Sequence, residues 1–154
     1  MTKSITVGCF TPVQSLDPHH VQDWVSGQIM EHLYDAPYLQ RSADEPIEAV
    51  IFESQLERRP APGGGIKAIG TIREGLKFSD GSPVTAKEVV ASLELAQPLQ
   101  GRCEISGSGR TVEFLLPQDD PRFEIELSRR WCSVVKQDGV DLLGTGPFAV
   151  RAGW

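Results

Sequence analysis

The side chains best suited to chemistry lie near the start of the chain, in the sequence D-P-H-H-V-Q-D of residues 17–23. Its carboxylates and imidazoles, from Asp17, His19, His20 and Asp23, are groups that transition metals accept as ligands. A turn at Asp17 followed by the exposed start of a helix explains the same residues without a metal. We favour that interpretation and expect no metal site.

Motifs of catalysis are missing from the sequence. It contains no G-x-S-x-G nucleophile elbow, no P-loop, no dinucleotide-binding fingerprint and no H-E-x-x-H or paired C-x-x-C. The glycine run 63–65 lacks the Lys and Ser/Thr of a phosphate-binding loop, and Asp119–Asp120 fits a helix cap better than a catalytic pair. We therefore predict a protein that is not an enzyme and needs no cofactor.

The cysteines are three in number and widely spaced, at Cys9, Cys103 and Cys132. An odd number of distant cysteines argues against a disulfide framework, so we expect free thiols. Cys9 falls in an apolar segment and Cys132 follows Trp131, which predicts that both are small buried hydrophobic residues.

Length and charge limit the class of protein. A chain of 154 residues suits a single domain, predicted here to span residues 1–154. Its formal net charge of −6 gives no footprint for nucleic acid or an anionic membrane, because both attract clustered Lys and Arg. No apolar run approaches the ~18 residues that span a bilayer, so membrane insertion is not expected either.

The first half of the chain is predicted to alternate strands and helices. Residues 5–10 form a strand, a loop follows over residues 11–18, and a helix runs from about His20 to Tyr34. The helix repeats Val21, Val25, Ile29 and Leu33 every four residues, an apolar stripe that should lie on a sheet. Residues 48–56 are predicted to form another strand.

The middle of the chain has clearer signals. The loop over residues 59–65 is expected to join two antiparallel strands, because a strand pattern resumes over residues 66–72. Apolar residues at even spacing over 72–78 continue this pattern to a tight turn at Asp80–Gly81. Thr85 and Glu88 then form a capping box for a helix that buries Val89, Val90 and Leu93.

The last third predicts a hairpin, a helix and a strand. Residues 102–105 and 111–116 pair around the turn at 106–109. Asp119 or Asp120 caps a helix from Pro121 that stacks Phe123 on Leu127, and residues 131–135 return to the sheet as a short strand. Together the elements indicate an α/β fold with a mixed sheet and packed helices.

Three segments of the chain resemble a known family when taken together. They are S-L-D-P at 15–18 with V-S-G-Q-I-M-E-H-L-Y-D at 25–35, the strand, turn and capped helix of 70–94, and G-T-G-P-F at 144–148. Their order resembles that of the family 5 extracellular solute-binding proteins, the peptide-, nickel- and oligosaccharide-binding components of ABC importers. Members are usually several times longer and have two lobes. The resemblance therefore implies a truncated single lobe of a type II periplasmic-binding-protein fold, with the second lobe absent.

The family resemblance also implies where a ligand would bind. Ligand lies between the two lobes, against the end of the opening strand, the loop behind it and the start of the first helix. The corresponding residues are Phe10, Thr11, Pro12, Gln22 and Trp24, with Ser133 and Thr145 as further candidates. Trp24 is an aromatic with a donor N–H, which suits a cleft, but it would equally suit the core or the edge of the lobe.

A single lobe offers only about half of the wall of a cleft, so a second surface is needed to enclose a ligand. We expect a non-enzymatic binding module for a peptide-like or other small ligand, with a second copy of the chain or another protein completing the cleft. The alternative is a cytoplasmic interaction, regulatory or carrier protein that docks another protein on the cleft face. No secretory signal precedes residues 5–10, which favours the cytoplasm over an exported protein whose signal has been removed.

Overall fold

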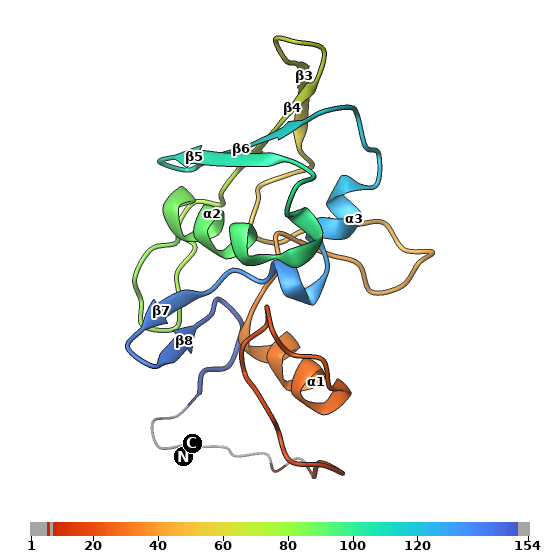
Figure 1. The fold of residues 1–154 in the computed structure, drawn as a ribbon. Helices are drawn as coiled ribbons and strands as arrows, with labels where there is room; N and C mark the ends of the chain where they lie inside the picture. The colour runs from red at the N-terminus through yellow and green to blue at the C-terminus, as the bar shows by residue number, and fades with distance from the viewer. Residues whose placement is uncertain (1–5, 7, 151–154) are drawn as a thin grey trace.

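A four-stranded antiparallel sheet forms the centre of the protein in a computed structural model, which describes residue 6 and residues 8–150. The strands are β3 (Glu57–Pro60), β4 (Ile66–Thr71), β5 (Glu104–Ser108) and β6 (Thr111–Leu116), in the order β3-β4-β6-β5. Helices α2 (Ala86–Leu95) and α3 (Phe123–Leu127) lie beneath the sheet (Figure 1). The predicted α/β fold is confirmed, and the strand pairs within the described residues are all antiparallel.

The core lies between this sheet and its helices. Val112, Phe114 and Leu116 alternate along β6 and are all buried, as expected for a strand with one covered face. The ring of Phe114 meets those of Phe52 and Phe123 edge-to-face, at centroid distances of 6.4 and 5.2 Å. Gly70 makes this packing possible, because a Cβ there would lie 2.8 Å from the Phe52 ring.

Helix α2 begins and packs as its sequence predicts. The backbone N–H of Thr85 donates to the Glu88 carboxylate at 3.1 Å, within the predicted capping box. Val89 and Leu93 are fully buried, whereas Val90 is half-buried. A short 3₁₀ helix, η1 (Gln97–Leu99), follows and leads to β5. The β5–β6 hairpin is confirmed, with its first strand at residues 104–108 instead of 102–105. Two antiparallel strands do flank the predicted loop, but the first of them is β3, at residues 57–60 instead of the predicted 48–56.

A second, smaller group of elements lies on the far side of α2 (Figure 1). It contains α1 (Trp24–Leu33) and the hairpin of β7 (Lys136–Asp138) and β8 (Asp141–Leu143). Met30, Leu33 and Tyr34 of the α1 region pack with Val135 in a small core of their own. The strands β1 (Tyr38–Leu39) and β2 (Glu48–Ala49) pair beside the main core.

The predicted placement of the first helix on the sheet is wrong. Asp23 is its N-cap, accepting the Ser26 N–H at 2.8 Å, so Val21 precedes the helix. The buried residues of α1 are Ser26, Gly27, Met30 and Leu33, and they face the turn η2 (Arg130–Cys132) and the small core instead of the sheet.

Four predicted strand segments also need correction. Residues 8–10 form no strand and leave Phe10 and Cys9 exposed, against the prediction of a buried Cys9; Ile5 and Val7 lie outside the described residues. Residues 48–56 contain only β2 and a single bridge from Phe52 to Ile72, and residues 72–78 are likewise irregular. Residues 131–135 include the end of η2 and no strand, although Cys132 is buried as predicted. No helix in the described part of the chain has the length and apolarity to cross a membrane.

Arg58 ties β3 to the segment that leads into α3. Its guanidinium donates to both carboxylate oxygens of Glu124, at 2.6 and 2.8 Å, and to Asp119 at 3.0 Å. The Glu124 side chain is only 9% exposed, so the ion pair with Arg58 is largely shielded from water. Arg58 therefore has a structural role.

Removing the guanidinium should leave Glu124 buried without a counter-charge. We expect Arg58→Ala to lower the free energy of unfolding by about 2–3 kcal/mol, measured by urea denaturation. The neighbour Arg59 pairs with Glu57 on the surface, where both side chains are about 60% exposed. Arg59→Ala should therefore cost less than ~0.5 kcal/mol, and equal losses in the two variants would contradict the assigned role of Arg58.

Candidate functional site

The last residues of α1 bind the backbone of the G-T-G-P-F segment. Gly146 N–H donates to the Leu33 carbonyl at 3.0 Å, and Phe148 N–H donates to the His32 carbonyl at 3.2 Å. The carbonyls at the end of a helix have no partners within it, so these two bonds satisfy groups that would otherwise need water. Two of the segments that carry the family resemblance are thus in direct contact.

This contact requires residues without a side chain at two positions. A Cβ on Gly144 would lie 2.1 Å from the Leu33 carbonyl oxygen, and one on Gly146 would lie 2.6 Å from that of His32. Both obstacles are backbone atoms, which cannot turn away as a flexible side chain would. The glycines are therefore fixed by the close approach of two backbones.

The turn at Asp80 joins the same junction. Ser79 N–H donates to the Gly144 carbonyl at 2.9 Å, and Lys136 of β7 binds the Asp80 carboxylate at 2.9 Å. Hydrogen bonds from Ser82 and Lys136 hold the pKa of Asp80 well below its usual range. Thr145 adds a hydroxyl bond to Asp35 at 2.8 Å.

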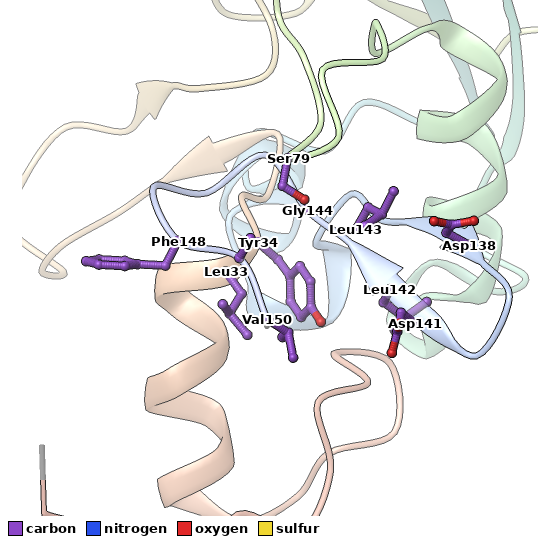
Figure 2. Close-up of a pocket in the computed structure, with 11 residues that line it drawn as sticks. Leu33, Tyr34, Ser79, Asp138, Asp141, Leu142, Leu143, Gly144, Phe148 and Val150 are labelled. Carbon is purple, nitrogen blue, oxygen red and sulfur yellow. The ribbon is translucent and has the colours of Figure 1, made fainter. Parts of the chain in front are cut away.

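A pocket of about 130 Å³ lies beside this junction, between the end of α1, the β7–β8 hairpin and residues 144–150 (Figure 2). We call it the helix–hairpin pocket. Tyr34 lines it and is only 4% exposed, and burial together with the charges of Asp17 and Asp141 raises its pKa to about 12. The phenol therefore stays protonated at neutral pH.

The D-P-H-H segment lies close to Tyr34 and is held by contacts among its own residues. The Asp17 carboxylate accepts the His19 N–H at 2.9 Å and contacts Nδ1 of His20 at 2.7 Å. The His19 side chain is 2% exposed, and its Nε2 has no partner among the described residues. Burial lowers the pKa of His19, which keeps the ring neutral. Within the described residues, no three His, Cys, Asp or Glu side chains are grouped to hold a metal ion.

The structure separates the predicted ligand-binding residues. Five are exposed on the N-terminal segment and the start of α1: Phe10, Thr11, Pro12, Gln22 and Trp24. Trp24 is 67% exposed, which excludes the core as its location. Ser133 is 4% exposed and Thr145 is bound to Asp35, so neither side chain is presented with the other five.

None of the predicted residues lines the helix–hairpin pocket, and sequence reasoning did not identify Tyr34 or Asp141 as site residues. In the sequence, Tyr34 was recognised only as part of the L-Y-D motif at the end of the first helix. Asp141 lies in the segment between Val135 and Gly144, for which the sequence predicted no element. Their proximity depends on contacts between segments more than 100 residues apart, as Thr145 and Asp35 illustrate.

Comparison with known proteins gives matches among solved structures only; no protein-family model matches the chain, and neither does any curated protein. The binding protein MoaA of A. tumefaciens R10, in complex with mannopinic acid, is 21% identical with a TM-score of 0.77 over 90% of this chain and 32% of its own. A nickel ABC transporter protein from Bacillus halodurans is 24% identical, with a TM-score of 0.70 over 92% and 30%. OppA of Listeria monocytogenes, bound to peptide, is 17% identical, with a TM-score of 0.70 over 87% and 33%.

These similarities define the class of fold, which is that of a periplasmic solute-binding protein. The resemblance to family 5 solute-binding proteins predicted from the motifs is confirmed at the level of the fold. The chain spans about a third of the length of the proteins that it matches.

The glycine requirement at the junction can be tested directly. Gly144→Ala should lower the free energy of unfolding by about 2 kcal/mol or more, because its Cβ meets the Leu33 carbonyl and the Tyr34 ring. Gly8→Ala, with no atom within 4 Å of the added Cβ, should change it by less than ~0.5 kcal/mol in the same urea titration. Equal stability of the two variants would show that the backbones do not approach as described.

The buried His19 should make stability depend on pH. Its folded pKa lies below the usual 6.5, so the unfolded chain binds more protons as the pH falls below that value. The free energy of unfolding should therefore fall from pH 7.5 to pH 5.5, and His19→Gln should reduce that fall. His32→Gln, at an exposed position, serves as the control. An unaltered pH dependence in the His19 variant would contradict a buried neutral ring.

Proposed function

We propose that this chain is a single non-enzymatic solute-binding lobe that contacts a peptide-like or other small ligand, with a second surface completing the cleft. The observation that carries the proposal is the shared fold. It matches proteins described in complex with mannopinic acid and with peptide, over about a third of their length. A second copy of the chain or another protein would supply the opposite wall.

The proposed ligand wall is the N-terminal segment together with the start of α1. Phe10 is 99% and Trp24 is 67% exposed, and the Gln14 N–H bonds to Ser26 Oγ at 3.0 Å, which holds the segment along the helix. An indole combines a large apolar area with one hydrogen-bond donor, the combination that a cleft for mixed polar and apolar ligands needs. Gln22 adds an exposed amide beside it.

A single wall of a cleft is expected to bind its ligand weakly. Association costs translational and rotational freedom, and clefts offset this cost by removing most of the ligand surface from water. An open wall removes only part of that surface. We therefore expect a partner to complete the cleft, and we expect the isolated chain to bind its ligand with modest affinity.

The same exposed side chains support the second candidate function, the docking of a protein on this face. Phe148 is also 61% exposed, and its ring centroid lies 6.1 Å from that of His32 in the last turn of α1. Large exposed apolar groups are typical of interaction surfaces. In this case the face would hold a protein in place of a small ligand.

Trp24→Ala separates these functions from a purely structural role. Native mass spectrometry of the chain with a mixture of tri- to pentapeptides should detect complexes. Calorimetric titration with the retained peptide should then show that the variant binds it about tenfold or more weakly than the unaltered chain. Stability should be unchanged because the side chain is exposed.

Leu95→Ala is the matched control, since Leu95 is 55% exposed on α2. Equal peptide affinity in Trp24→Ala and Leu95→Ala would remove Trp24 from the proposed wall. A dimer or protein complex that Trp24→Ala dissociates, without peptide binding, would establish the docking function instead.

A further inference from the structure

Tyr34 is a largely buried residue whose side chain lines the helix–hairpin pocket. The residue is 4% exposed, and its hydroxyl makes no hydrogen bond with the residues that the structure describes. Figure 2 shows the ring extending into the helix–hairpin pocket, with its oxygen directed toward the side on which Asp141 lies. A phenol that reaches a pocket in this way is available to a ligand atom.

Two carboxylates lie at the same pocket, and both lack a counter-ion within the described residues. Asp138 and Asp141 belong to the β7–β8 hairpin and form no ion pair there. The nearby cation Lys136 is already engaged with Asp80 at 2.9 Å and Ser82 at 2.8 Å. The pocket therefore has a negative rim beside a phenol oxygen that has no hydrogen-bond partner among the residues the structure describes.

The remaining wall is apolar and small. Leu33, Leu142, Leu143 and Val150 line it, while the Phe148 ring points away (Figure 2). Its volume of about 130 Å³ is slightly less than the ~150 Å³ of a cavity that holds benzene. A short alkyl chain with one charged end fits these dimensions, whereas a whole peptide does not.

We propose that the helix–hairpin pocket binds a primary alkylammonium group, whose N–H bonds are accepted by the Asp141 carboxylate and the Tyr34 hydroxyl oxygen. The alkyl chain contacts the leucines. A small free amine and a lysine side chain share this chemistry. The site is independent of the proposed ligand wall, because it uses none of the residues assigned to that wall.

The test is a titration of the ¹⁵N-labelled chain with n-butylammonium chloride, followed by two-dimensional NMR at constant ionic strength. Saturable shifts should appear at the amides of Tyr34, Leu142 and Gly144. n-Butanol has the same alkyl chain without the charge, and butyrate reverses the charge, so each should bind at least tenfold more weakly. Absent or non-saturable shifts with n-butylammonium would overturn the proposal, as would equal binding of n-butanol.

Two variants test the assigned atoms. Asp141→Asn should weaken n-butylammonium binding about tenfold, and Tyr34→Phe about fivefold, because each removes one acceptor from the ammonium group. Asp44→Asn, in the exposed loop between β1 and β2, makes the same change of charge away from the pocket and should have no effect. Equal affinities in Asp141→Asn and Asp44→Asn would refute the site even if n-butylammonium binds.

A second titration distinguishes the sources of the group. Nα-acetyl-lysine methylamide should compete with n-butylammonium if the pocket accepts a lysine side chain, and failure to compete assigns the site to small free amines. Trp24→Ala should leave n-butylammonium binding unchanged. Loss of binding in that variant would show that the two sites are not independent and would overturn the assignment to the pocket.

Discussion

The structure depends on the close approach of two backbones, that of residues 144–148 and that of the last turn of α1. Gly146 and Phe148 donate to carbonyls that the helix leaves unpaired, and Gly144 and Gly146 leave no side chain between the chains. This contact fixes the end of α1 against the β7–β8 hairpin and so defines the helix–hairpin pocket. Helix α1 is otherwise held by its packing on η2 and by the small core that it shares with Val135.

Elements with strong local signals were predictable from the sequence. The capping box at Thr85 and Glu88, the loop between β3 and β4, and the β5–β6 hairpin all depend on residues close together in the chain, and all are present. The N-terminal strand and the contacts of α1 were not predictable in the same way. An alternating pattern over residues 5–10 does not reveal whether a partner strand exists, and a helix repeat does not reveal which neighbour it will face.

In the candidate site, too, features that depend on local sequence were predictable, whereas contacts between distant residues were not. The motifs could be recognised one at a time, and Trp24 could be identified as a suitable aromatic. Their meeting at the end of α1 could not be predicted, because it joins residues 110 positions apart, as in the Thr145–Asp35 bond. Tyr34 illustrates the difficulty, since its ring is buried while its hydroxyl is left for the pocket, and no sequence pattern distinguishes that arrangement from an ordinary core tyrosine.

The separation of Asp35 and Thr145 has a consequence for the order of folding. Closing a loop of that length costs about 4 kcal/mol in chain entropy by the logarithmic rule, before any bond across it forms. Strands β3 to β6 and helix α2 have their partners much nearer in sequence, so they assemble with a smaller entropic cost. The entropic cost therefore favours formation of the sheet and α2 before the contact between residues 144–148 and the end of α1.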